Sequence, residues 1–156
     1  MKYIDRIPSL PQPFFDLGHS IHETLEKFYD KYDYTVRDES YLMRIYSTIF
    51  EKYTEGYKSA DEKKLYYENG EKMLKDYFNS FIRNSEFAPA FITEAYFELP
   101  LGKLVAINGY IDRIDKLPEG DYEILDYKTE PTDRTQTEID EDDQLSIYFW
   151  AAQKAF

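Results

Sequence analysis

Residues 103–129 form the segment that most limits what this chain can fold into. The segment, KLVAINGYIDRIDKLPEGDYEILDYKT, reads as two apolar-rich runs joined by a short turn that contains Pro118 and Gly120. This is the pattern of a β-hairpin. Asp126 and Lys128 are two residues apart in the second run. Because side chains alternate between the faces of a strand, we expect these two on the same face.

The pairing of the two strands decides whether a second acid joins that face. If each pair joins two odd-numbered or two even-numbered residues, Asp112 lies opposite Ile124 or Asp126 on the same face. Side chains directly opposite each other are roughly 5 Å apart at Cβ, and diagonal ones roughly 7 to 8 Å. Two carboxylates at this spacing can share one divalent cation, whereas a slip of one residue would place them on opposite faces.

Two carboxylates and a lysine on adjacent strands suit the hydrolysis of a phosphodiester. Hard oxygen ligands favour Mg²⁺ or Mn²⁺, and such a cation polarises phosphate and lowers the pKa of water. The ammonium group of Lys128 can orient the water or neutralise developing charge. Charged residues are also common on the exposed face of a hairpin, so the DxK triplet alone has little specificity.

The sequence around these residues resembles a known family. GYIDRID, followed by YEILDYKT and then QLSIY, is similar to the motifs of the PD-(D/E)XK nuclease superfamily in its RecB-like branch. The resemblance implies that Asp112, Asp126 and Lys128 are catalytic and that both aspartates bind the metal. It implies a Mg²⁺- or Mn²⁺-dependent deoxyribonuclease, expected to be an exonuclease in DNA repair or recombination, or in CRISPR-associated processing.

The same resemblance extends to both sides of the hairpin. GHSIHETLEKFY is similar to an N-terminal RecB-like motif, in which His22 completes the metal shell; a boundary residue of a helix is the alternative. Glu94 takes the place of an acid in a second metal shell, although an exposed strand glutamate fits the same position. QLSIY resembles the QxxxY motif, which implies that Gln144 and Tyr148 bind the substrate strand.

Helices are predicted for most of the first half of the chain. Apolar residues recur at helical spacing within residues 14–32, 39–57 and 60–84, and Asp16 is the expected cap of the first helix. The expected buried stripes are Leu17, Ile21, Leu25, Phe28 and Tyr32, then Leu42, Ile45, Tyr46, Ile49 and Tyr53, then Leu65, Tyr66, Met73, Tyr77 and Phe81. Core packing is the default role of these aromatic side chains, and base stacking is the alternative.

A further strand and a further helix are predicted around the hairpin. Residues 91–99 alternate as a strand, and a helix over residues 140–156 follows a polar loop, with Asp140 as its cap. The expected buried stripe of this helix is Leu145, Tyr148, Phe149, Ala152 and Phe156. The predicted fold class is α/β, with a mixed or antiparallel sheet flanked by helices and an N-terminal helical half.

The resemblance implies a restriction-endonuclease-like αβββα(β) core. We expect residues 1–156 to form one nuclease-like domain, with the helical half at about 14–88. The three strands and the C-terminal helix are expected at about 90–156, and the final strand of the family's core is expected to be missing.

Net charge bears on the kind of partner. The chain has 19 basic and 31 acidic residues, a net charge of −12, which repels polyphosphates and argues against tight unaided binding of nucleic acid. Eleven acidic and two basic residues lie between Glu119 and Asp143. A cation site fits this clustering, although an exposed acidic loop explains most of these residues more simply. A catalytically inactive nuclease fold that binds DNA or regulates, and an acidic protein-interaction domain, are the alternatives to an enzyme.

Composition excludes several kinds of site. Because the chain has no cysteine, it cannot form disulfides, thiolate zinc sites or an iron–sulfur cluster. We find neither a long apolar run nor a basic leader, and so predict no membrane span and no secretory signal. The expectation is a cytoplasmic protein whose partners are DNA, as a single strand or an unwound end, and a helicase or another nuclease subunit.

Overall fold

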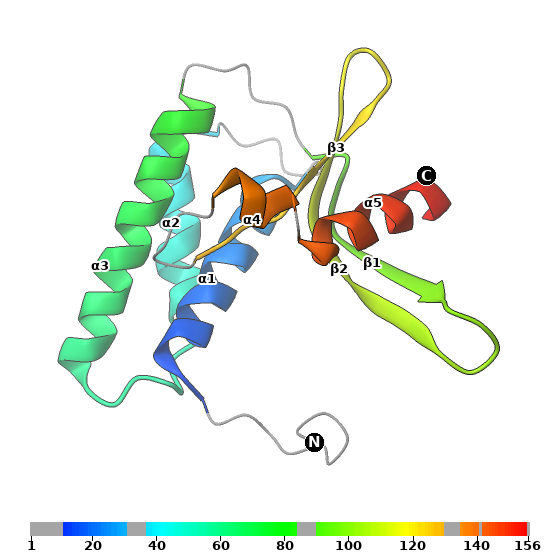
Figure 1. Cartoon of the computed structure of the whole chain (residues 1–156). Helices are drawn as coiled ribbons and strands as arrows, with labels where there is room; N and C mark the ends of the chain where they lie inside the picture. Colours follow the sequence, from blue (N-terminus) through cyan, green and yellow to red (C-terminus); the bar gives the residue numbers. More distant parts are fainter. Residues whose placement is uncertain (1–10, 31–36, 84–89, 130–134, 141, 156) are drawn as a thin grey trace. The chain divides into compact units, whose positions relative to one another are not determined.

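The computed structural model describes residues 11–30, 37–83, 90–129, 135–140 and 142–155 (Figure 1). It divides into a helical unit, residues 1–28 and 36–87, and a sheet unit, residues 29–35 and 88–156. The sheet is antiparallel and three-stranded. The predicted α/β class with an N-terminal helical half is therefore confirmed, and it is consistent with a restriction-endonuclease-like fold.

The elements follow the predicted order, with one addition. The helical unit contains α1 (Pro13–Phe28), α2 (Glu39–Phe50), α3 (Ala60–Tyr77) and the π-helical turn η1 (Phe78–Ile82). The sheet unit contains β1 (Ile92–Pro100), β2 (Ala106–Lys116), β3 (Tyr122–Leu125), α4 (Gln136–Asp140) and α5 (Asp143–Ala155). None of the helices in these described ranges is both long and apolar enough to cross a membrane.

The helices α1, α2 and α3 lie side by side around an apolar core (Figure 1). The predicted stripe of α1 is buried at Leu17, Ile21, Leu25 and Phe28, whereas Tyr32 lies outside the described residues. On α2 the predicted stripe is largely confirmed, because Leu42, Tyr46 and Ile49 are buried, and Phe50 joins them. Period-3.6 patterning therefore identified the buried faces of both helices.

The start of α1 differs from the prediction. The helix begins at Pro13 rather than near Asp16, which suits proline because the first helical position needs no N–H donor. Asp16 lies in the first turn, where its carboxylate accepts a hydrogen bond of 2.7 Å from the backbone N–H of Gly56. Asp16 thus joins α1 to the segment after α2 instead of capping its own helix.

The buried face of the third helix also differs from the prediction. Gly70, Leu74, Phe78 and Ile82 are buried along α3 and η1, whereas Leu65 and Phe81 are exposed. A Cβ atom on Gly70 would lie only 2.0 Å from the hydroxyl oxygen of Tyr46. Because Gly70 has no side chain, α3 can approach α2 closely at this point. The contact buries a face of α3 that the spacing of its apolar residues did not indicate.

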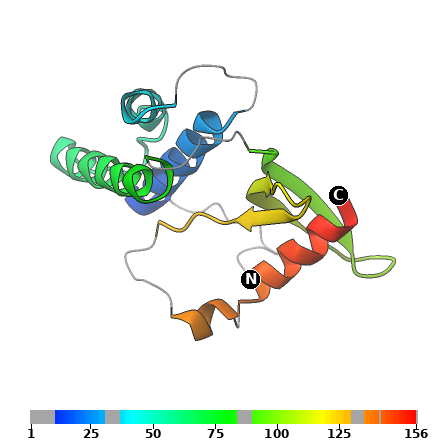
Figure 2. The same cartoon turned by 90° about the horizontal axis from the view of Figure 1, so that it is seen from above.

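The sheet has the order β1-β2-β3. The predicted turn between β2 and β3 is confirmed, because the N–H of Gly120 donates to the carbonyl of Leu117 at 3.0 Å. One side of the β1–β2 ribbon packs against α5 (Figure 2). There the ring of Tyr148 meets that of Phe97 edge-on, with the ring centres 5.8 Å apart. Ala95, Leu99 and Ile111 are also part of this core.

The C-terminal segment differs from the predicted loop and helix. A short helix, α4, lies where a loop was expected, and α5 begins at Asp143 rather than Asp140. The residue before α5, Asp142, accepts a hydrogen bond from the N–H of Gln144 at 2.8 Å, which is the contact that Asp140 was expected to make. The cap was misplaced because this run of acids offers several equivalent candidates.

The predicted stripe of α5 is only partly correct. Tyr148 is buried as expected, but Leu145 and Phe149 are exposed, and Ala151 takes the second buried position. Phe156 lies outside the described residues. Because α5 packs against only one side of a narrow sheet, only a short stretch of one face of this helix is buried.

The close contact at Gly70 predicts the effect of a single methyl group. Gly70→Ala improves helix propensity by about 1 kcal/mol, but the clash with Tyr46 costs up to about 3 kcal/mol. We expect a net loss of about 1 to 2 kcal/mol in the free energy of unfolding, measured by urea denaturation. Asn69→Ala at the exposed neighbouring position is the control and should not destabilise. Equal stability of Gly70→Ala and wild type would contradict this packing.

Candidate functional site

The pairing of β2 with β3 satisfies the condition for bringing two acids together. Arg113 pairs with Leu125 and Ile114 with Ile124, so every pair joins two odd-numbered or two even-numbered residues. Continuing this register by one residue beyond Leu125 places Asp126 opposite Asp112. The two aspartates therefore lie on the same face of the sheet.

The pairing of β1 with β2 adds a third acid. Thr93 pairs with Arg113 and Ala95 with Ile111, so Glu94 stands opposite Asp112. The carboxylate atoms of Glu94 and Asp112 that could bind a metal lie within 4.8 Å of one another. Glu94 of β1, Asp112 of β2 and Asp126, the residue directly after β3, thus form a line that we call the acid row.

The backbone is unusual where the acid row crosses β1. Glu94 has φ = +48°, a left-handed conformation in the middle of a strand. Such a conformation is uncommon for a residue with a side chain, and it persists where the surroundings impose it. Strain at this position is consistent with a functional carboxylate, and Asp112 beside it is 9% exposed.

A backbone hydrogen bond fixes the end of β3 beside Asp112. The N–H of Tyr127 donates to the Asp112 carboxylate at 2.6 Å. Tyr127 lies between Asp126 and Lys128 in the sequence, so this bond holds both residues next to Asp112 although the β3 ladder ends at Leu125. Sequence reasoning missed this contact, because it involves a backbone group that leaves no mark in the residue pattern.

A polar chain continues from Asp126 to α5. The ammonium of Lys128 lies 2.6 Å from the Asp126 carboxylate and donates to the side-chain oxygen of Gln144 at 2.8 Å. The amide of Gln144 donates to the hydroxyl of Tyr148 at 2.7 Å. These four residues, which the sequence predicted as site residues, therefore form one connected set.

The pKa of Tyr148 reports the electrostatics of this region. Burial raises the pKa of the Tyr148 phenol, and the nearby Asp126 carboxylate raises it further. The hydrogen bond with Gln144 acts in the opposite direction, while Asp112 and Glu94 add smaller upward effects. The phenol thus senses all three members of the acid row. A positive charge placed among them would offset this field.

Comparison with known proteins agrees with this geometry. The family model described as the PD-(D/E)XK nuclease superfamily matches residues 1–156. The chain belongs to this superfamily. Members of the PD-(D/E)XK superfamily are generally metal-dependent nucleases. No curated protein and no solved structure matches the chain.

Arg113 of this superfamily member follows Asp112 in β2, so it lies on the opposite face of the sheet from the acid row. Its guanidinium donates to the carboxylate of Asp115, with an Nε–oxygen distance of 2.8 Å, and lies 3.5 Å from the centre of the Tyr29 ring. Burial alone would lower the pKa of Arg113, but the hydrogen bond to Asp115, together with Tyr29 and Tyr127, outweighs this effect and the pKa is raised. Arg113 and Asp115 are two apart in β2, a spacing that could have suggested this pair.

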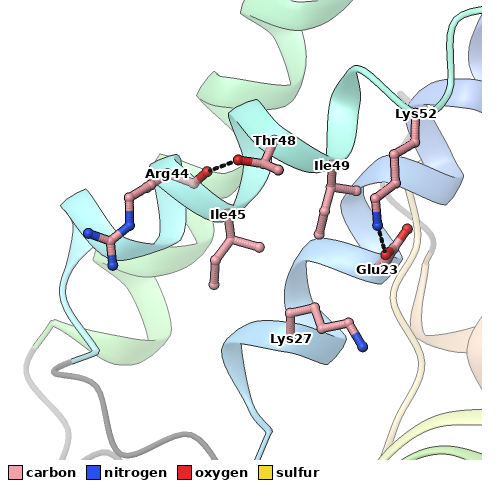
Figure 3. Close-up of a pocket in the computed structure, with 7 residues that line it drawn as sticks. All are labelled: Glu23, Lys27, Arg44, Ile45, Thr48, Ile49 and Lys52. Carbon is pink, nitrogen blue, oxygen red and sulfur yellow. Dashed lines mark hydrogen bonds and ion pairs between the residues drawn. The ribbon is translucent and has the colours of Figure 1, made fainter.

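The remaining predicted site residue, His22, lies on α1 in the helical unit, where its side chain is half-buried. The same helix lines a pocket of about 410 Å³ (Figure 3). Ile45 and Ile49 of α2 supply its apolar part, while the Glu23 carboxylate is paired with Lys52 and accepts a hydrogen bond from Tyr53. This pocket contains one carboxylate, whereas the acid row brings the carboxylates of Glu94 and Asp112 within 4.8 Å of each other.

The strain at Glu94 predicts an inverted preference between glycine and alanine. Glycine adopts the left-handed conformation without penalty, so Glu94→Gly should be more stable than Glu94→Ala by about 1 kcal/mol in urea denaturation. Glu98, the next outward-facing acid on β1, is the control. There Glu98→Gly should be the less stable variant, because glycine weakens a regular strand. The same order at both positions would contradict a special backbone at Glu94.

Proposed function

We propose that this chain is a metal-dependent deoxyribonuclease of RecB-like type, which hydrolyses DNA phosphodiesters by attack of water. The observation that carries this proposal is the acid row with Lys128 beside it. Glu94 and Asp112 approach within 4.8 Å, and Lys128 lies 2.6 Å from Asp126. Superfamily membership over residues 1–156 supports it.

The acid row has the donors that a hard cation needs. Carboxylate oxygens are preferred by Mg²⁺ and Mn²⁺, so we assign Asp112 and Asp126 as ligands and His22 as the residue that completes the shell. Glu94, from its distance to Asp112, belongs to the same set or holds a water beside it. When bound, the cation polarises the phosphate and lowers the pKa of water.

Lys128 acts on charge and on water in this proposal. An ammonium group has three donors and no acceptor, so it cannot bind the cation. Its contacts with Asp126 and Gln144 leave donor capacity for a water or a phosphate oxygen. Gln144 is held in turn by Tyr148. We therefore assign Lys128 to orienting the nucleophile and stabilising negative charge during attack, and Gln144 and Tyr148 to positioning the substrate strand.

The net charge of −12 bears on how the substrate arrives. A negative field lowers both the affinity for DNA and the rate of encounter. We propose that DNA is delivered as a single strand or unwound end by a helicase or another nuclease subunit. An exonuclease in repair or recombination, or in CRISPR-associated processing, would work in this way.

Metal binding should stabilise the folded chain through the acid row. Millimolar Mn²⁺ should raise the melting temperature, because a ligand at 100 times its Kd contributes about 2.7 kcal/mol. Asp112→Ala and Asp126→Ala should lose most of this response, and Asp121→Ala in the exposed turn should keep it. An unchanged response in both site variants would locate the metal elsewhere.

The two histidines of α1 provide a matched test of the third ligand. In His22→Ala, the Mn²⁺ concentration required to raise the melting temperature should increase about tenfold, because a metal ligand is lost. His19→Ala removes a ring that lies 5.5 Å from Tyr53 and should leave this concentration unchanged. Equal responses from the two variants would remove His22 from the metal shell.

Catalysis and metal binding should separate at Lys128. Lys128→Ala should keep the Mn²⁺-induced stabilisation but lose cleavage by about 10²-fold or more, as expected for a group that acts during attack. Single-turnover cleavage of plasmid and single-stranded DNA in Mn²⁺, against a metal-free control, measures this. Lys116→Ala at the exposed end of β2 is the control.

The same assay decides between the enzyme and its alternatives. A chain that binds DNA without cutting it would be an inactive nuclease-fold module, and one that neither binds nor cuts DNA would be an acidic interaction domain. A Lys128→Ala variant that cuts as fast as wild type would refute the assigned role of this lysine.

A further inference from the structure

Two exposed tyrosines pair across the sheet directly beside the acid row. Tyr96 of β1 pairs with Tyr110 of β2, and their ring centres are 5.3 Å apart. The side chains are 56% and 55% exposed. Large aromatic side chains usually bury most of their surface, so an exposed cross-strand pair is a surface suited to a ligand.

Strand alternation places this pair on the same face as the acids. Ala95, Phe97 and Leu99 of β1 point into the core, whereas Tyr96 and Glu98, which alternate with them, are exposed on the other face. On β2, Tyr110 precedes Asp112 by two residues, which places them on one face about 7 Å apart along the strand. The tyrosine pair is therefore the row next to Glu94 and Asp112.

We propose that Tyr96 and Tyr110 form a stacking surface for a base of single-stranded nucleic acid whose phosphate lies at the acid row. This inference rests on the proposed nuclease function and adds two residues that contact its single-stranded substrate. A strand that passes from the acid row to the next row of the sheet would place a nucleoside over the tyrosine rings. Bases in a duplex are already stacked on one another, so the surface selects unpaired ones.

Charge favours this kind of contact. In a chain of net charge −12, phosphate contacts alone give little affinity, whereas stacking on a neutral ring is not opposed by the field and tolerates any base. The hydroxyl of Tyr96 donates to the carboxylate of Glu98 at 3.2 Å. This bond anchors the far end of one ring and leaves the ring faces available.

A protein partner is the competing occupant of this side of the sheet. Leu101, Leu104 and Val105 at the tip of the β1–β2 hairpin are exposed and apolar, which would suit a protein surface. The row formed by Glu98 and Asn108 lies between this tip and the tyrosines. The tyrosine pair is thus next to the acids and separated from the apolar tip, which favours the substrate strand as its occupant.

The test is the DNA concentration for half-maximal single-turnover cleavage of single-stranded oligo(dT) in Mn²⁺. In the variant Tyr96→Thr with Tyr110→Thr, this concentration should rise about tenfold, the loss expected for one stacked base. The rate at saturating DNA should stay within about twofold. Threonine suits an exposed strand position, so the fold should be kept. The control is Tyr122→Thr, which removes an exposed tyrosine that pairs with Phe91 on the same sheet.

Abasic substrates identify the contact itself. Single abasic sites moved along the oligonucleotide should raise the half-maximal concentration about tenfold at one position for wild type, and at no position for the threonine variant. Tyr96→Phe keeps the ring and should behave as wild type. An unchanged concentration in the threonine variant would overturn the proposal, as would a variant that changed only the oligomeric state in sedimentation, which would indicate a protein interface.

A binding assay separates failure of this inference from failure of the proposed function. Fluorescence anisotropy of labelled oligo(dT) in EDTA, at low salt, measures the same contact without cleavage. Wild type that does not cut DNA but binds it about tenfold more tightly than the threonine variant would refute the nuclease and retain the stacking surface. Cleavage with equal binding and equal half-maximal concentrations would retain the nuclease and refute the stacking surface.

Discussion

The pairing of β2 with both of its neighbours is the constraint on which the candidate site depends. Residues of like parity face each other on either side of this strand, so each outward position of β2 extends into a row across the sheet. One row consists of Glu94, Asp112 and Asp126, and the next of Tyr96 and Tyr110. A slip of one residue would invert every position on the slipped strand, so the site and the core depend on the same register.

The acid row gathers features that a merely exposed strand would lack. Asp112 is almost buried and holds the backbone of Tyr127, while Glu94 occupies a left-handed conformation within β1. Burying a carboxylate is costly unless it is hydrogen-bonded or paired with positive charge, and clustering several carboxylates adds repulsion. Such costs, concentrated in one place, are typical of functional sites, and the chain belongs to a superfamily whose members are generally metal-dependent nucleases.

Several parts of this fold followed from local pattern. Alternation in residues 91–99 and 103–129 predicted the strands and the hairpin turn, because period-2 patterning depends only on neighbouring residues. The buried stripes of α1 and α2 were also predicted from local pattern, in their case from apolar residues at helical spacing. The stripe of α3 did not, because its packing centres on Gly70, a residue with no side chain to count. The stripe of α5 was only partly correct, because Leu145 and Phe149 are apolar yet exposed.

The sequence by itself determined membership of a nuclease superfamily, the presence of two aspartates and a lysine in motifs that resemble those of the family, and the parity that allows both acids to share one face. Tertiary structure decided what surrounds them. The approach of Glu94 to Asp112 joins β1 to β2, and the contacts that link Lys128, Gln144 and Tyr148 join the end of β3 to α5. Residue spacing predicts which side chains share a face of one element, but contacts between elements require a register and a packing arrangement that only the folded chain supplies.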